Sequence, residues 1–599
     1  MKRLPLAVAY ATLCVSLAAC SSSDSPTPDT PTTPPDTPPT TPVVAHITPI
    51  EELNQGDDAV NSHADETDRA QLTMNYRTYT DITSSSLGVT KPHYTRIKKL
   101  KDGSYILFYH QNQIGADCYY ATSTDLLHWS FGQQLFSRYS ITDSSGNKNE
   151  RRYANCDALV LSNGDIVAVA SFRANNGYRS LPKDAGIELR RSTDNGRTWS
   201  APIQIYQGVN WEPYLLEPSP GVLQCYFTDS SRTGTEGADT GTAMVTSADN
   251  GLTWSPALGA DPLYVLRMKW QKDGKTYFNH QMPSVIRLNG GNMLAAAMET
   301  HAPAGYFISL AHSHEDGQWD KLTKNDEGPA DSQNLYFSGC APYLTQFPSG
   351  ETALSYNSGS KYYLKLGDAQ ARKFYEAICP FSGSGFWGTL QLIDSHRLIG
   401  MMPNTGAGTV MMAQFVLNHR IKATQRTVTV DGGNAEWSTR DDALFVGSKS
   451  LTQGTLRCSQ DANNIYLLVE TRDMTPQIND RTIVMIGSEN AKHELAEGSL
   501  RLLISTSGLV TAKSYQGTWK TYAQKKDLSV KTSVCNGKNT GKEELFGYVT
   551  EIAIPRKALN IQNGRLIVNL GVRDGSGDLD ALANIESTNT QKWMVISGL

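Results

Sequence analysis

The chain has 599 residues, of which 39% are hydrophobic, and a formal net charge of −5. Because this length exceeds what one hydrophobic core usually holds, we expect at least two domains. The charge is nearly balanced and no basic block is present, which excludes a typical nucleic-acid-binding protein. After the first 20 residues no long apolar run follows, so the sequence predicts no transmembrane domain.

Residues 1–20 have the pattern of a secretory signal, with Lys2 and Arg3 ahead of a short apolar run. The run ends in Leu-Ala-Ala-Cys20, which resembles the bacterial lipobox and implies lipidation of Cys20. The alternative is an ordinary signal peptide with a chance cysteine. Residues 21–45 are mostly Ser, Thr, Pro and Asp and predict an extended linker. We therefore expect a lipid-anchored protein on a bacterial membrane, with the outer membrane favoured, facing the surface or the periplasm.

The nine cysteines give no sign of a metal site or a disulfide framework. Cys14 leaves with the signal and Cys20 would carry lipid, so an odd number remains, without CxxC or Cys/His spacing. No EF-hand spacing is present either. We expect no cofactor and no metal ligand, although a structural calcium stays open.

A turn motif recurs along the first two thirds of the chain. "STDNGRTWS" at 192–200 has a near copy, "SADNGLTWS", at 247–255, and weaker copies occupy 123–129 and 313–319. Apolar strands on either side of a glycine turn also recur, and the turn glycines, 57 to 69 residues apart, are Gly103, Gly164, Gly221, Gly290 and Gly350. One copy alone would be a common hairpin, whereas the series predicts a closed β-propeller of four-stranded blades over residues 46–422. A sixth blade would begin near 401–413 and be completed by a strand around 72–82.

The C-terminal part, residues 423–599, has a different pattern. Alternating strands with Asn, Asp and Gly turns predict a β-sandwich. The succession Val430-Asp431-Gly432, Glu436-Trp437 and Ile554-Pro555 resembles the family 9 carbohydrate-binding modules, which implies glycan binding. Trp437 is expected in the core, and Trp519 and Trp593 are alternative sugar platforms. The fold class expected overall is all-β, a six-bladed propeller followed by a sandwich.

The Ser-x-Asp-x-Gly-x-Thr-Trp turn resembles the Asp box of the sialidase superfamily, which includes sialidases and exo-α-1,5-L-arabinanases. The resemblance implies six blades, with each Asp box between the third and fourth strands, away from the catalytic face. The turn is therefore interpreted as scaffold rather than chemistry.

Candidate site residues lie where the first strand of a blade starts and the second ends, since these positions share one face of a propeller. Glycoside hydrolysis uses two carboxyl groups, and the candidates are Glu212, Glu299 and Asp157. For a retaining enzyme, Glu299 is the candidate nucleophile and Glu212 the acid/base. The residues expected to bind substrate are His93, Trp211, Arg173, His280, Gln281, His301 and Tyr356.

Two other functions stay open beside an exo-arabinanase-like glycosidase. Glu212, Glu217 and Gly221 match a sialidase spacing, but the Phe/Tyr-Arg-Ile-Pro motif that begins the sialidase arginine triad is replaced by "PHYTRIKKL". Only Arg173 and, less readily, Arg96 remain as cavity arginines, which argues for a neutral sugar. The alternatives are an exo-α-sialidase with an atypical site and a non-catalytic surface glycan-binding protein. The expected partner is an oligo- or polysaccharide, and we expect a monomer.

Overall fold

The computed structural model describes residues 45–56, 66–231, 239–269, 271–272, 275–276, 280–302, 305–319, 336–447, 449, 451–537 and 545–599. The predicted signal peptide, Cys20 and nearly all of the predicted linker lie outside these residues. Within the described residues, no helix combines the length and the apolar character needed to cross a membrane.

Six small antiparallel sheets follow one another along the chain, each with its innermost strand first in this account. The first three are β2 (Pro92–Lys99), β3 (Tyr105–Gln111), β4 (Cys118–Ser123) and β5 (Gln133–Phe136); β7 (Lys148–Val160), β8 (Ile166–Ala174), β9 (Gly186–Ser192) and β10 (Ile203–Gln207), with β6 (Tyr139–Thr142) added beside β7; and β11 (Asn210–Ser219), β12 (Val222–Asp229), β13 (Asp239–Ser247) and β14 (Leu263–Lys269). The next three are β17 (Gln281–Arg287), β18 (Leu294–Ala302), β19 (Gly305–Glu315) and β20 (Gln318–Trp319), with β21 (Phe337–Ser338) beside β19; β22 (Cys340–Gln346), β23 (Thr352–Ser358), β24 (Lys361–Gly367) and β25 (Phe374–Ile378); and β26 (Thr389–Leu392), β27 (Arg397–Asn404), β28 (Thr409–Asn418) and β1 (Gln71–Ile82). These are the blades of a six-bladed propeller, as predicted.

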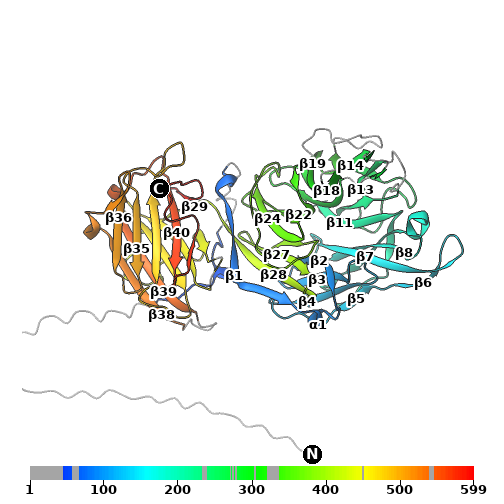
Figure 1. Cartoon of the computed structure of the whole chain (residues 1–599), viewed down its shortest axis with the longest axis horizontal. Coiled ribbons are helices and arrows are strands. Elements are labelled where there is room, and N and C mark those ends of the chain that lie inside the picture. The colour runs from blue at the N-terminus through cyan, green and yellow to red at the C-terminus, as the bar shows by residue number, and fades with distance from the viewer. Residues whose placement is uncertain are drawn as a thin grey trace, which may run out of the picture. The chain divides into compact units, whose positions relative to one another are not determined.

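The sixth blade closes the ring with an N-terminal strand. β1, in blue, lies beside β28, in yellow-green, and pairs with it from Gln71↔Asn418 to Ile82↔Val410 (Figure 1). The prediction that this blade begins near Met401 is wrong, because Met401 lies in its second strand and the innermost strand is β26. At four residues, β26 is too short to show a strand pattern, whereas the longer apolar run after it does.

A separate hydrophobic cluster fills each junction between neighbouring blades. At the closing junction, for example, Ile97 and Leu107 of the first blade pack with Ile399 and Met412 of the sixth. Every one of these side chains is at most 1% exposed. Burial of this extent, repeated around the ring, holds the innermost strands at fixed positions about the axis.

The Asp boxes lie where the resemblance implied. Ser192–Ser200 connects β9 to β10, the third and fourth strands of its blade. The Asp194 carboxylate accepts hydrogen bonds from the Thr198 backbone N–H and hydroxyl, and these bonds lower the pKa of Asp194 to about 2. Trp199 packs edge-on against Phe108 and Tyr120 of the preceding blade. The turn therefore fixes one blade to the next.

The C-terminal part forms two sheets, as a β-sandwich. One sheet contains β29 (Ile421–Lys422), β42 (Met594–Ser597), β40 (Leu566–Arg573), β34 (Arg481–Gly487), β35 (Leu500–Ser505), β36 (Val510–Tyr515) and β37 (Trp519–Thr521), with β41 (Leu579–Ala581) beside β40. The other contains β30 (Thr424–Gln425), β32 (Gln453–Gln460), β33 (Asn464–Arg472), β39 (Phe546–Pro555) and β38 (Ser529–Asn536), with β31 (Ala443–Val446) beside β32. Trp437 is buried and donates to Glu551, in the core as predicted. Trp593 is fully buried, which removes it as a sugar platform, whereas Trp519 is half-buried against Tyr515.

The remaining elements are short. β15 (Gln271–Lys272) and β16 (Lys275–Thr276) form a hairpin of their own. The one α-helical turn of the described chain, α1 (Ser84–Leu87), follows β1 and has Thr83 as its N-cap. Single 3₁₀ turns occupy Ile50–Glu52, Thr67–Arg69, Tyr178–Ser180, Pro182–Asp184, Lys525–Asp527 and Arg556–Ala558.

Candidate functional site

The innermost strands share a bulge at the same end of the axis. In five blades the pairing with the second strand shifts by one residue, for instance between His93 and Arg96. At each shift one residue adopts a left-handed backbone conformation, and in the sixth blade Trp387 does so just before β26. The six residues, with φ between 51° and 64°, are Tyr94, Asn155, Glu212, Met282, Ala341 and Trp387. Non-glycine residues rarely adopt this conformation, and such strain concentrates at functional sites.

These six positions converge on the axis. Tyr94, Met282 and Ala341 pack together with Trp387, although they come from four different blades. The Tyr94 and Trp387 ring centroids are 6.3 Å apart. We call the six residues the axial ring. Glu212 is its only carboxylate, which makes its environment the first question for chemistry.

Glu212 is half-buried, and its carboxylate accepts a hydrogen bond of 2.6 Å from the Thr228 hydroxyl. The same hydroxyl oxygen accepts the backbone N–H of Met282 at 2.9 Å, which ties the third blade to the fourth. Burial raises the pKa of Glu212 to about 8, the Thr228 hydrogen bond opposes this, and the charge of Glu299 adds to it. Glu212 therefore carries a proton at neutral pH and can donate it.

Glu299 lies at the end of β18 and is 5% exposed. One carboxylate oxygen accepts from the Gln281 side chain at 2.5 Å and the other from the backbone N–H of Ala341 at 2.7 Å. Burial raises the pKa of Glu299 to about 7, and both hydrogen bonds oppose the rise. Because both oxygens are bound by donors, the ionised form of Glu299 is better supported than that of Glu212.

Asp157 is engaged in a buried ion-pair network. Its carboxylate is 2.9 Å from the Lys98 ammonium and 3.8 Å from the Arg96 Nε atom, and it also accepts the Ala158 backbone N–H. Lys98 donates in turn to the hydroxyl of Tyr343. The side chain of Asp157 is 1% exposed. Asp157 thus neutralises two cations inside the axis, a positioning role rather than proton transfer.

Arg96 is also held within the protein. Its guanidinium donates to the backbone carbonyls of Thr95, Trp387 and Gly388 and lies 3.9 Å from the centroid of the Tyr94 ring. These contacts hold Arg96 against the axial ring and occupy most of the donors with which it could bind a ligand.

Arg173 and Trp211 form a stacked pair beside Glu212. The guanidinium carbon of Arg173 is 4.1 Å from the Trp211 ring centroid, and one terminal nitrogen donates to the Ile114 carbonyl. The other terminal nitrogen, Nη1, is buried without a partner among the described residues. Burial lowers the pKa of Arg173, and the neighbouring charge of Glu212 partly opposes this. The arrangement presents a donor and an aromatic surface next to the acid.

Three histidines stand near the ring, and burial lowers the pKa of each, to about 3 for His110 and His280. They are therefore neutral at neutral pH. His280 Nδ1 lies 3.1 Å from the hydroxyls of Ser309 and Thr300. Within the described part of the chain, the Nε2 atoms of His110 and His280 are buried and unpartnered. Unsatisfied buried polar atoms are rare, and neutral imidazoles suit sugar hydroxyls.

The other predicted residues are distributed as follows. Gln281 positions Glu299 directly. His301 stacks on Tyr306, with centroids 4.4 Å apart, and is half-buried beyond Glu299 on β18. Tyr356 packs between Phe337 and Tyr363, and burial raises its pKa to about 12, so it is a packing residue with a neutral hydroxyl.

Sequence reasoning missed Trp387 and Thr228. Trp387 went unnoticed because its blade was given the wrong innermost strand, yet "FWGT" at 386–389 occupies the slot of "WEPY" at 211–214. Nothing in the sequence marks Thr228, since its role depends on two blades meeting. Asn357, near the end of β23, accepts the Trp387 backbone N–H at 3.0 Å and so holds that ring member.

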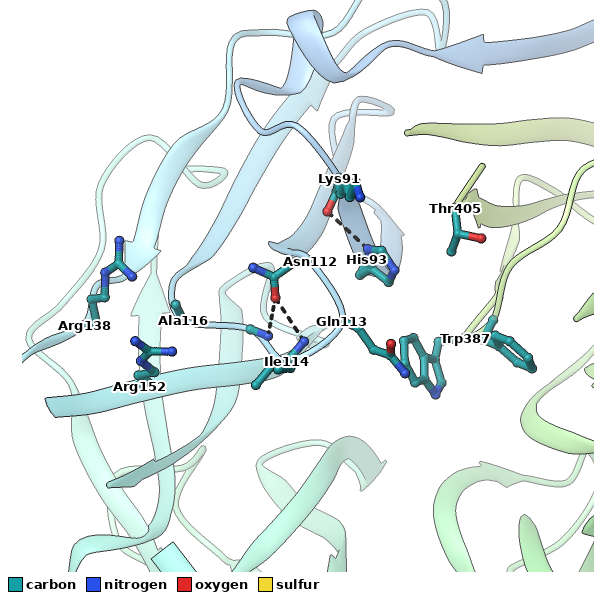
Figure 2. A pocket seen from close by; sticks show the side chains of 12 residues that line it. Lys91, His93, Asn112, Gln113, Ile114, Ala116, Arg138, Arg152, Trp387 and Thr405 are labelled. Atoms are coloured by element: carbon teal, nitrogen blue, oxygen red, sulfur yellow. Dashed lines mark hydrogen bonds between the residues drawn. The ribbon is translucent and has the colours of Figure 1, made fainter. Parts of the chain in front are cut away.

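A cavity of about 570 Å³ opens beside the axial ring (Figure 2). His93 and Trp387 line it, and their ring centroids are 6.0 Å apart. Among the residues the structure describes, no group of three or more His, Cys, Asp or Glu side chains is arranged to hold a metal ion. The side chains described at and beside the ring offer carboxyl, imidazole, amide and guanidinium groups.

No protein-family model matches the chain, and no curated protein is similar to it in sequence. Similar solved structures include a protein of unknown function from Dyadobacter fermentans (16% identity, 59% of this chain and 100% of that one, TM-score 0.42). A Penicillium chrysogenum α-L-arabinanase complexed with arabinobiose is 18% identical (58% and 98%, TM-score 0.40). A family 9 carbohydrate-binding module from Caldicellulosiruptor kristjanssonii is 14% identical (30% and 94%, TM-score 0.24). These similarities are too distant to bear on what the chain does, so its function has to be argued from the axial ring.

Proposed function

We propose that the protein is an exo-acting glycoside hydrolase that removes terminal sugars from an extracellular glycan. The observation that carries this proposal is the pair Glu212 and Glu299, a half-buried and a buried carboxyl from adjacent blades. Their pKa values are raised to about 8 and about 7, and the charge of Glu299 contributes to the shift at Glu212. A protonated and an ionised carboxyl, held apart by environment, are the groups that glycosidic cleavage requires.

The hydrogen bonds support distinct roles for the two groups. Glu212, held by the single hydroxyl of Thr228, acts as the acid that protonates the leaving oxygen. Glu299, with a donor on each oxygen, acts as the ionised nucleophile. In a retaining reaction Glu212 then activates the water that releases the sugar.

The filled axis supports cleavage at chain ends. Beyond the ring, the half-buried Tyr214 and the buried Tyr343 pack with ring centroids 5.7 Å apart, and Lys98, which pairs with Asp157, donates to the Tyr343 hydroxyl. A glycan cannot thread through this packing and reaches the pair from the open end, which supports binding of a terminal unit at the ring.

The cations near the ring support a neutral terminal sugar. Arg96 donates to backbone carbonyls, and its Nε atom, which makes no hydrogen bond, faces Asp157 at 3.8 Å. The Arg173 Nη1 atom is the other buried arginine donor described near Glu212 that makes no hydrogen bond. A sialic-acid carboxylate is ordinarily held by several bidentate guanidinium contacts. An exo-arabinanase-like activity fits better than a sialidase.

The test is product release from arabinans, sialoglycans and other polysaccharides, followed by chromatography. Wild type should release a neutral sugar, and Glu299→Gln should not. Glu212→Gln should fail on polysaccharide but release a single burst of dinitrophenol from a dinitrophenyl glycoside of the released sugar, because that leaving group needs no acid whereas the second step has lost its base. Glu217→Gln is the matched control, since Glu217 lies on the same strand and bonds Ser162 and Gly221. Release of sialic acid would overturn the sugar assignment, and the absence of any product would favour a glycan-binding protein.

We also propose that lipid on Cys20 anchors the enzyme to a bacterial membrane, and that the C-terminal sandwich binds glycan. The lipobox-like sequence supports the first of these, and half-buried Trp519 supports the second. Radiolabelled palmitate incorporation that Cys20→Ala abolishes would test the anchor. Loss of polysaccharide retention by Trp519→Ala would test the sandwich.

A further inference from the structure

The cavity beside the axial ring is large enough for a sugar unit. Its volume, about 570 Å³, falls in the range of small-molecule sites. It shares Trp387 with the axial ring, includes His93 next to the ring member Tyr94, and continues outward from there to Arg152 on the innermost strand of the second blade. A chain whose terminal sugar occupies the ring would place its following units in this direction.

One side of the cavity carries positive charge. Arg138 and Arg152 line this side, Lys91 lines the cavity beside His93, and no Asp or Glu lines the cavity. Arg138 forms an ion pair with Asp117 through its Nε atom, at 3.5 Å, and Arg152 forms one with Glu150 through its Nε atom. Each guanidinium group is therefore paired with one carboxylate, and among the described residues no hydrogen bond is made by the terminal nitrogens of either group or by the Lys91 ammonium.

The opposite side of the cavity is aromatic. Phe386, which is 37% exposed, and Trp387 line it. Figure 2 shows Arg138 and Arg152 on one side and Trp387 on the other, with the loop of Asn112 and Ile114 between them. The Asn112 side-chain oxygen accepts the N–H groups of Ile114 and Gly115, so the loop is held in place. Aromatic faces bind sugar rings, and guanidinium forks bind carboxylate or sulfate groups.

We propose that this cavity is a subsite for an acidic sugar unit, with its carboxylate or sulfate bound by Arg138 and Arg152 and its ring against Trp387 and Phe386. The inference rests on the proposed hydrolase, whose substrate then becomes a neutral terminal sugar carried on an acidic glycan chain. Arg138 and Arg152 would contact the part of the substrate that leaves, not the terminal sugar. The enzyme can therefore select a neutral terminal sugar and, at the same time, an acidic unit in the chain that carries it.

Calorimetric binding to the full-length chain carrying Glu212→Gln tests the subsite. One arm compares trigalacturonate with its methyl ester, and the other compares a sulfated galacto-oligosaccharide with its desulfated form. The charged ligand of at least one pair should bind about tenfold more tightly than its neutral partner, an advantage that salt weakens. Discrimination in the first pair alone identifies a uronate, and in the second alone a sulfate ester. Equal binding within both pairs overturns the proposal.

Adding Arg138→Gln and Arg152→Gln should remove the discrimination, with Arg138→Gln alone as the milder variant. Arg197→Gln, in an Asp-box turn at the other end of the blade, is the matched control and should retain it. If the control loses discrimination equally, the subsite is refuted. Binding that depends on the arginines while wild type cleaves no glycan refutes only the hydrolase. Cleavage with no preference for acidic chains refutes only the subsite.

Discussion

Replacing Glu212 by glutamine should abolish polysaccharide turnover and, at alkaline pH, stabilise the fold. The reason is that burial raises the pKa of Glu212 from 4.5 to about 8, so the folded state holds a proton that the unfolded chain releases. A carboxyl of this kind lowers stability as pH rises from its unfolded pKa toward its folded pKa. Glutamine keeps the shape and a hydrogen-bonding group but has no such penalty.

The size of the effect follows from the two pKa values. One pKa unit corresponds to about 1.36 kcal/mol, so between pH 5 and pH 9 the wild type should lose about 4 kcal/mol of stability through Glu212. The loss is complete once the pH exceeds the folded pKa of about 8. Glu299 contributes a smaller loss of the same sign that both proteins share, because its pKa rises only to about 7.

Urea denaturation of wild type, Glu212→Gln and Glu217→Gln at pH 5 and pH 9 measures this difference. The difference in free energy of unfolding between Glu212→Gln and wild type should increase by about 4 kcal/mol from pH 5 to pH 9, in favour of the variant. Glu217→Gln should follow the wild type, since Glu217 is bonded at the surface to Ser162 and Gly221. If Glu212→Gln shows the wild-type pH dependence, Glu212 is not a buried acid with a raised pKa, and its assignment as the proton donor fails.

Three further predictions follow from other parts of the propeller. The pH profile of kcat/KM should be bell-shaped, rising as Glu299 ionises near pH 7 and falling as Glu212 ionises near pH 8, and an optimum below pH 5 would contradict both roles. Asp157→Asn should lower the free energy of unfolding, measured by urea denaturation, by about 3–5 kcal/mol, because it leaves the cations of Lys98 and Arg96 buried and uncompensated. An unchanged urea midpoint would mean that the ion-pair network is dispensable. Trp199→Ala should cost about 2 kcal/mol by thermal unfolding through lost packing on Phe108 and Tyr120, with turnover per folded molecule unchanged if the Asp box is scaffold.

The blades could be predicted from the sequence because each repeat contains its own local signals. Gly103 and Gly164 adopt positive φ at the turns between first and second strands, which explains the regular spacing of glycines. The innermost strand of the sixth blade could not be predicted in this way. β26 forms a hairpin with β27 but has only four residues, too few to show a strand pattern. Ring closure supplies only the outermost strand of this blade, β1, which pairs with β28.

The sequence predicts which residues lie at the strand ends of the candidate site, but it does not predict their hydrogen-bond or ion-pair partners. Glu212 and Glu299 were identified from position alone, whereas their different roles depend on Thr228, Gln281 and the Ala341 N–H, which come from other strands. Asp157 shows the limit of such reasoning. Its position in the repeat resembles that of a catalytic carboxyl, but the cations that occupy it come from the neighbouring blade.

The aligned stretches "HYTR", "ANCD", "WEPY", "QMPS", "CAPY" and "FWGT" suggest how one scaffold separates structure from chemistry. The second residue of each adopts the left-handed conformation, and in three of them proline follows, which cannot donate to the ladder and so suits a bulge. The bulge is a property of the fold, repeated in five blades, and the sixth blade has the left-handed residue at the same position without the shift in pairing. The residue types at those six positions then decide the chemistry. A single carboxylate, Glu212, among apolar, aromatic and amide neighbours is in the low-polarity surroundings that keep a carboxyl protonated at neutral pH.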